Sequence, residues 1–91
     1  MERDEASSAR SAGASLFAPP AKRSVTIAGH QTAISLEPIF WKALREEAAR
    51  EGIPINALIA RIDVERLAAA QPPNLASAIR CWLFDVTYRA Q

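Results

Sequence analysis

Few residues in this sequence have side chains that could carry out chemistry, and they lie far apart. The chain has one histidine, His30, and one cysteine, Cys81. The sequence contains no glycine-rich phosphate loop, no nucleophile motif and no cluster of histidine, cysteine and aspartate. A structural zinc site needs about four ligands, which one histidine and one cysteine do not supply. We therefore expect a protein that is not an enzyme and that has no cofactor and no metal.

The individual polar residues have simpler interpretations. We expect His30 to be a surface residue in a turn or at the end of a strand. Cys81 is expected to be a small packing residue within a helix. The alternating charges of residues 61–66 are typical of a solvated helix face. Function must then depend on what the chain binds.

Two short segments have the alternation of β-strands. In residues 24–28 and 31–36, apolar and polar side chains alternate, and β-branched residues are frequent. Gly29 and His30 between them could form a two-residue hairpin turn with glycine at its first central position. Alternatively, residues 24–28 are an extended lead-in and only the second segment is a strand. The sequence leaves both possibilities open.

The spacing of the larger apolar residues predicts three helices, over residues 38–50, 54–67 and 74–89. Gly52 is suited to end the first helix, and Asn74 is a favourable N-cap for the third. The apolar stripes expected to face the core contain Phe40, Leu44 and Ala48 beside Trp41, then Ile55, Leu58, Ile59 and Ile62, then Leu75, Ala78, Ile79, Trp82, Leu83 and Val86.

The composition allows one small core. Apolar residues make up 49% of the 91 residues, but many of them are alanines. A core of this size leaves a thin margin over chain entropy, so we expect the chain to oligomerise. No apolar run is long enough to span a membrane, and the acidic N-terminal segment does not resemble a signal or transit peptide. We expect a cytoplasmic protein that does not bind membranes.

Several segments together resemble the ribbon–helix–helix family of bacterial DNA-binding proteins, which includes the Arc and MetJ repressors. The similarity covers about residues 22–88, and within the family it is greatest to a small subfamily with an additional C-terminal helix. The matching segments are Lys22-Arg23-Ser-Val-Thr-Ile-Ala-Gly-His, Ile34-Ser35-Leu36-Glu37-Pro38, Phe40-Trp41, Ala43-Leu44-Arg45, Ala57-Leu58-Ile59, Asn74-Leu75 and Ser77-Ala78-Ile79-Arg80.

The resemblance implies a mainly helical fold with a short β-ribbon, in an intertwined homodimer. One strand from each chain would pair antiparallel about a two-fold axis, with the helices packed beneath the ribbon. The core shared by the two chains would contain Ile34, Leu36, Phe40, Leu44, Leu58, Ile59 and Ile62.

The outward face of such a ribbon fits the major groove of DNA. Gln31 could pair with adenine, Ala33 could contact a thymine methyl group, and Ser35 could bond to either kind of base edge. The backbone at the start of the second helix could bind a phosphate. The DNA-binding residues implied by the resemblance are Lys22, Arg23, His30, Gln31, Ala33, Ser35 and Asn56.

The sequence therefore predicts a dimeric regulator of transcription that binds double-stranded DNA. One alternative is a protein–protein interaction module on the same fold, which would use Phe84 and Tyr88 as exposed aromatic residues of the third helix. A second alternative, an antitoxin-type repressor, is disfavoured because no long tail follows residue 91. We expect residues 1–21 to be a disordered arm and residues 22–89 to form the domain.

Overall fold

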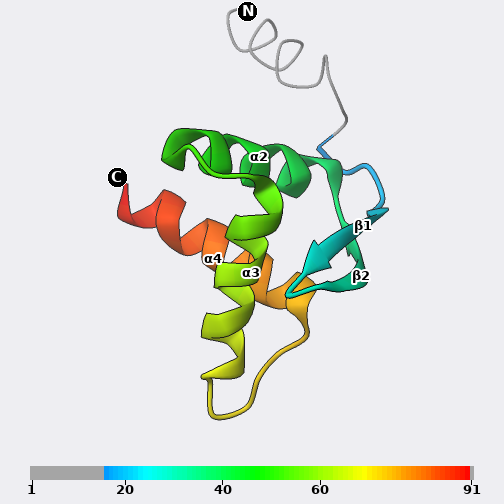
Figure 1. Ribbon diagram of the computed structural model, residues 1–91. Coiled ribbons are helices and arrows are strands. Elements are labelled where there is room, and N and C mark those ends of the chain that lie inside the picture. Colours follow the sequence, from blue (N-terminus) through cyan, green and yellow to red (C-terminus); the bar gives the residue numbers. More distant parts are fainter. Residues whose placement is uncertain (1–15, 91) are drawn as a thin grey trace, which may run out of the picture.

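The computed structural model describes residues 16–90, so most of the predicted N-terminal arm lies outside the described residues. Two strands come first in the described chain, and three helices follow (Figure 1). This arrangement confirms the predicted fold class, a mainly helical chain with a short β-ribbon. The elements are β1 (Ala21–Ile27), β2 (His30–Leu36), α2 (Pro38–Glu51), α3 (Ile55–Leu67) and α4 (Leu75–Arg89).

Strands β1 and β2 form an antiparallel hairpin in which Ala21 pairs with Leu36 and Ile27 pairs with His30. The hairpin alternative is therefore the right one, but the predicted turn residues are wrong by one position. The two central residues are Ala28 (φ 51°) and Gly29 (φ 84°), so glycine is second and not first. Positive φ at both positions gives the turn the twist of the flanking strands. Each chain thus has two strands, where the resemblance implied one.

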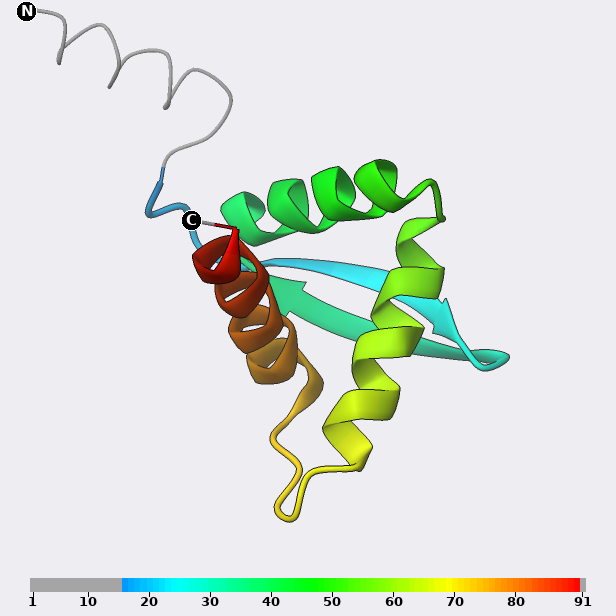
Figure 2. The ribbon, with the colours of Figure 1, turned by 90° about the vertical axis from the view of Figure 1, so that its left-hand side faces the viewer.

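The three helices lie on one face of the hairpin and leave its other face uncovered (Figures 1 and 2). Helix α3 packs against β1, while α2 and α4 pack against β2. The buried apolar residues lie between these layers and come from all five elements. They are Val25, Ile27, Ile34, Leu36, Trp41, Leu44, Ala48, Leu58, Ile59, Ile62, Ile79 and Leu83.

All but one of the residues expected in a shared core are already buried within one chain. The exception is Phe40, which is only partly buried, whereas its neighbour Trp41 is 1% exposed. Strand β1 and helix α4 complete this core, and neither belongs to the minimal strand–helix–helix unit. A second copy would therefore add to a core that one chain already forms in large part. A core shared by two chains stays a prediction.

The helix ends follow the expected local chemistry. Gly52 ends α2 in the left-handed conformation at φ 70°, and the side chain of Asn74 accepts a hydrogen bond of 2.8 Å from the backbone N–H of Ser77. Helix α4 also contacts the start of α2, where Arg80 forms an ion pair of 3.0 Å with Glu37.

The prediction that Cys81 is a packing residue is wrong. Cys81 is exposed, because it lies on the side of α4 opposite the buried Ile79 and Leu83.

Candidate nucleic-acid interface

The uncovered face of the hairpin is a regular row of small and polar side chains. Residues directly opposite in the register point to the same face of a sheet. The exposed pairs on the uncovered face are Lys22 with Ser35, Ser24 with Ala33, and Thr26 with Gln31. We call these six residues the outer row.

Four of the seven predicted DNA-binding residues belong to the outer row: Lys22, Gln31, Ala33 and Ser35. Sequence reasoning missed Ser24 and Thr26. The signal for them was the alternation of residues 24–28, in which Val25 and Ile27 had to face the core once the segment was a strand.

Arg23 belongs to the other face of the hairpin. It lies opposite the buried Ile34, and its guanidinium carbon is 5.4 Å from the centre of the Trp41 ring. The indole Nε1–H of Trp41 donates a hydrogen bond of 2.9 Å to the carbonyl oxygen of Ala21. Through these two contacts, β1 packs against the first turn of α2. The structure therefore separates Arg23 from Lys22, its neighbour in the sequence.

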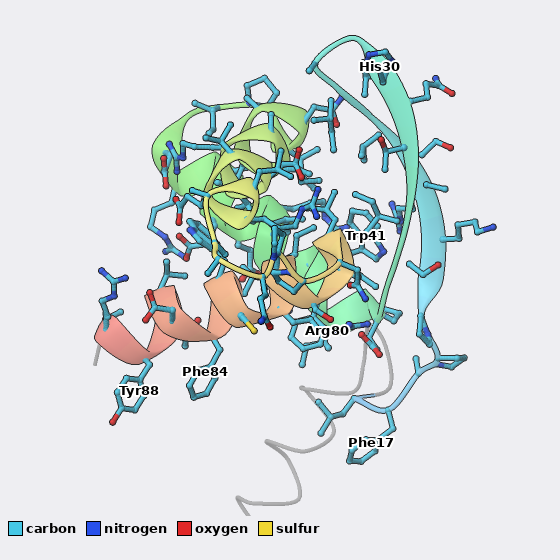
Figure 3. The ribbon with its side chains drawn as sticks, turned by 90° about the horizontal axis from the view of Figure 1, so that it is seen from below. Phe17, His30, Trp41, Arg80, Phe84 and Tyr88 are labelled. Atoms are coloured by element: carbon cyan, nitrogen blue, oxygen red, sulfur yellow. The ribbon has the colours of Figure 1, made fainter. Side chains whose placement is uncertain are left out.

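His30 and Asn56 also lie apart from the outer row. His30 pairs with Ile27 at the turn end of the hairpin, where its side chain is exposed (Figure 3). Asn56 is half-buried in the first turn of α3, the helix that packs against the core-facing side of β1. No side chain caps the start of α3, and Pro54 occupies the N-cap.

Within residues 16–90, the basic residues of the hairpin form no ion pair with an acidic residue. No acidic residue occurs between Leu16 and Leu36, whereas Lys22 and Arg23 are both exposed on β1. The arginines of the helices are mostly neutralised by carboxylates within the described chain. The ion pairs are Arg50 with Glu47, Arg61 with Glu51, Arg66 with Asp63, Arg80 with Glu37 and Arg89 with Asp85.

A family model described as a ribbon–helix–helix domain matches residues 20–87, which is more than half of the chain. The chain belongs to the ribbon–helix–helix family. No curated protein and no solved structure matches it. Ribbon–helix–helix domains are typical of DNA-binding regulators, and β-ribbon proteins of this kind read base edges with their strands.

In this ribbon–helix–helix domain, Glu37 is the residue that connects the end of β2 to the start of α2. The pKa of the Glu37 carboxyl group lies below its ordinary value, mainly because of a hydrogen bond to its own backbone. Desolvation acts in the opposite direction, and the nearby Arg80 lowers the pKa further. Glu37 therefore stays ionised at neutral pH and holds the Arg80 side chain of α4 near the end of β2.

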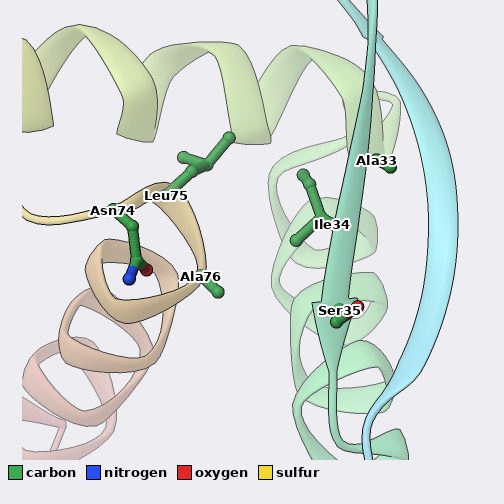
Figure 4. Close-up of a pocket in the computed structure, with 6 residues that line it drawn as sticks. All are labelled: Ala33, Ile34, Ser35, Asn74, Leu75 and Ala76. Carbon is green, nitrogen blue, oxygen red and sulfur yellow. The ribbon is translucent and has the colours of Figure 1, made fainter.

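One shallow hollow of about 250 Å³ lies between β2 and the start of α4 (Figure 4). Its lining has no charged side chain, and the oxygen of the Asn74 amide already accepts the capping hydrogen bond. The lining residues are Ala33, Ile34, Ser35, Asn74, Leu75 and Ala76.

Neither a membrane-spanning helix nor a metal-binding cluster occurs in the part of the chain that the structure describes. The helices of residues 16–90 include none that is long and apolar enough to cross a membrane. The same residues hold no group of three or more histidine, cysteine and acidic side chains that could bind a metal ion. The outer row is the candidate site that the family and the geometry both favour.

Proposed function

We propose that this ribbon–helix–helix protein is a dimeric, cytoplasmic regulator of transcription that inserts its β-ribbon into the major groove of double-stranded DNA. The observation that carries the proposal is the outer row, an exposed line of small and polar side chains on a hairpin with no acidic residue. The hairpin lies within a single chain, so each copy would bring two strands to the dimer.

The dimensions of the hairpin suit the groove. Its two strands are about 5 Å apart, and the major groove of B-DNA is about 12 Å wide, which leaves room for side chains on both strands. Seven residues a strand give a ribbon of about 23 Å in length. A sheet of four strands would be too wide, which favours one hairpin for each half-site.

Each member of the outer row has a suitable role. The Gln31 amide can bond to adenine with both a donor and an acceptor, and Ala33 can contact a thymine methyl group. Lys22, the only charged member, would bind a backbone phosphate. The hydroxyl groups of Ser24, Thr26 and Ser35 can bond to base edges or to phosphate oxygens.

The predicted contacts of Arg23, His30 and Asn56 would be to the DNA backbone at the sides of the ribbon. Arg23 on the opposite face would add local positive charge without reading bases, and the exposed His30 at the turn end could donate a hydrogen bond to a phosphate. The first backbone N–H groups of α3, near Asn56, are suited to a phosphate. These assignments are secondary to the outer row.

Selection from random duplexes with the purified full chain tests the proposal directly. We expect a preferred site and an affinity that falls steeply with salt, by a slope of about 0.9 for each phosphate contacted. Gln31→Ala should relax the preference at one base pair, where a bidentate contact contributes about 1–3 kcal/mol of discrimination. A wild-type chain with neither a sequence preference nor a salt-dependent affinity would overturn the proposal.

Lys42 offers a matched control for the charge. Like Lys22, it is exposed and forms no ion pair among the described residues, but it lies on α2, behind the hairpin. We expect Lys22→Gln to lower the salt slope by about 0.9, the value for one phosphate, and Lys42→Gln to leave the slope unchanged. Equal effects of the two variants would mean that the salt slope depends on the net charge of the protein and not on a phosphate contact of Lys22.

The second candidate is a protein–protein interaction module without specific DNA binding. The observation that favours it is the pair of exposed aromatic residues on α4, Phe84 and Tyr88, each 69% exposed. Such a module would show no preferred DNA site, and substitutions in the outer row would leave its partner binding unchanged.

A further inference from the structure

The first turn of α2 is the place where both strands of the hairpin meet the helices. Strand β2 ends one residue before Glu37 and α2 begins one residue after it, so Glu37 alone connects the two elements. Strand β1 reaches the same turn through the contacts of Trp41 with Ala21 and Arg23. The angle between the hairpin and the helices therefore depends on the contacts of this turn.

Arg80 of α4 reaches this turn with two different contacts (Figure 3). Its Nε–H donates a hydrogen bond of 3.1 Å to Oε1 of Glu37, and its Nη2 lies 3.0 Å from the same oxygen. Its guanidinium carbon lies 5.7 Å from the centre of the Phe40 ring. A planar guanidinium that binds a carboxylate and also lies over a ring has a defined orientation. On the β1 side of the turn, the corresponding contact is that of Arg23 with Trp41.

Apolar packing holds the hairpin on the helices but does not by itself fix its angle. The four buried side chains of the hairpin lie between the layers, and the free energy gained by burying them has no preferred direction. Packing between β2 and the start of α4 is incomplete, because the hollow of about 250 Å³ lies there (Figure 4). A charge-assisted hydrogen bond, in contrast, has a preferred length and angle.

The outer row is sensitive to this angle, because it begins close to Glu37 and extends away from it. Ser35 is two residues before Glu37, and Gln31 is six residues before it. Gln31 is thus about 20 Å along the strand, where a rotation of about 5° at the turn would displace it by about 2 Å. The length of a hydrogen bond varies by only about 0.5 Å, so such a rotation would break a contact of Gln31 with a base.

We propose that Arg80 is a positioning residue for DNA recognition, through which α4 holds the hairpin at one angle to the helices. The outer row then presents its side chains in a single geometry. The inference rests on the proposed function only for the DNA that the outer row would read. It gives α4 a role in recognition, although no residue of α4 belongs to the outer row.

Residual dipolar couplings of the backbone N–H groups measure the angle of the hairpin without DNA. In the wild type, the couplings of the hairpin and of the helices should fit one rigid alignment. In Arg80→Gln, the couplings of β1 and β2 should be smaller relative to those of the helices, because the hairpin then samples several angles. Arg80→Lys keeps the charge without the planar fork and should restore part of the wild-type couplings. A variant that is merely less stable leaves the couplings of its folded molecules unchanged.

Arg66 offers a matched control for Arg80. It is also a partly exposed arginine in an ion pair, 2.8 Å from Asp63, and its side chain is 22% exposed against 33% for Arg80. Its hydrogen-bond partners lie in α3 and in the loop before α4, and not in the hairpin. Arg66→Gln removes the same charge and breaks a comparable ion pair, and we expect it to leave the couplings of the hairpin unchanged.

Affinity for the preferred duplex gives the second readout. Arg66→Gln should bind as tightly as the wild type does. Arg80→Gln should bind about tenfold more weakly, which corresponds to a hairpin that has the binding angle for about a tenth of the time. Glu37→Gln should weaken binding by a similar factor although it removes a negative charge, and the double variant should bind no more weakly, because both substitutions break one contact.

Three results would overturn the proposal. They are unchanged couplings of the hairpin in Arg80→Gln, equal reductions in Arg80→Gln and Arg66→Gln, or equal affinity of Arg80→Gln and the wild type for the preferred duplex. A wild type without a preferred duplex would overturn the proposed function instead. The couplings would still decide whether Arg80 holds the hairpin at one angle, because they are measured without DNA.

Discussion

Lys22 and Arg23 are adjacent basic residues that lie on opposite faces of the hairpin, and neutralising each should have a different effect. Lys22 is in the outer row, whereas Arg23 lies over the Trp41 ring at 5.4 Å. We expect Arg23→Gln to destabilise the fold and Lys22→Gln to leave its stability unchanged. Each variant removes one positive charge and keeps a long polar side chain, so the two are matched.

The size of the effect follows from the interaction between Arg23 and the Trp41 ring. A cation over an indole ring at an exposed site contributes about 0.5–1 kcal/mol. For a domain of 60–100 residues, a loss of 1 kcal/mol lowers the unfolding temperature by about 4–8 °C. Thermal unfolding followed by circular dichroism should therefore give a midpoint lower by about 2–8 °C for Arg23→Gln and an unchanged midpoint for Lys22→Gln.

A double-mutant cycle with Trp41→Phe isolates the contribution of the ring. The second substitution removes the hydrogen bond to the Ala21 carbonyl but keeps an aromatic face of weaker quadrupole, so part of the Arg23 contribution should remain. Equal midpoints for wild type, Lys22→Gln and Arg23→Gln would refute the assignment of Arg23 to the inner face. So would an additive cycle with no coupling energy between Arg23 and Trp41.

Three further outcomes follow from the fold. Ala28 has a positive φ of 51°, and Ala28→Asn gives the Asn-Gly turn that hairpins of this type prefer. This variant should have a free energy of unfolding in urea that is higher by about 1 kcal/mol. Ile79→Ala should destabilise it by about 2–5 kcal/mol, because α4 is part of the core; a loss below about 1 kcal/mol would mean that α4 is only an appendage. The pKa of Glu37 is lowered in the folded chain, so its stabilising contribution is present above the ordinary carboxyl pKa and disappears as the pH falls. Glu37→Gln should accordingly unfold at a lower temperature than wild type at pH 7, and this difference should shrink as the pH falls below the ordinary carboxyl pKa; a difference that does not shrink in acid would contradict this.

The helices could be predicted from the sequence because their signals are local. Gly52 and Asn74 mark helix ends by their own backbone and side-chain chemistry, and the structure has them in those roles. The predicted turn differs from the observed one by a single position. Alanine disfavours positive φ, but the pairing of β1 with β2 holds Ala28 in that conformation. Local propensity gives no sign of a strain that is imposed by register.

The candidate site was only partly predictable for a related reason. Alternation within 31–36 placed Gln31, Ala33 and Ser35 on one face, and the structure has them there. Which face Lys22 and Arg23 take depends on the register of β1, and that register was open until the hairpin was known. The exposure of Cys81 was missed because the third helix has apolar residues on both sides, and periodicity does not say which side faces the core.

The core of this chain depends less on a second copy than the core of a minimal one-strand chain does. A minimal chain with one strand needs a partner in order to fold, since its edge and its apolar face have no other cover. Here β1 covers one edge of β2, and α4 fills the core with Ile79 and Leu83, so the chain itself supplies part of the cover that a one-strand chain takes from its partner.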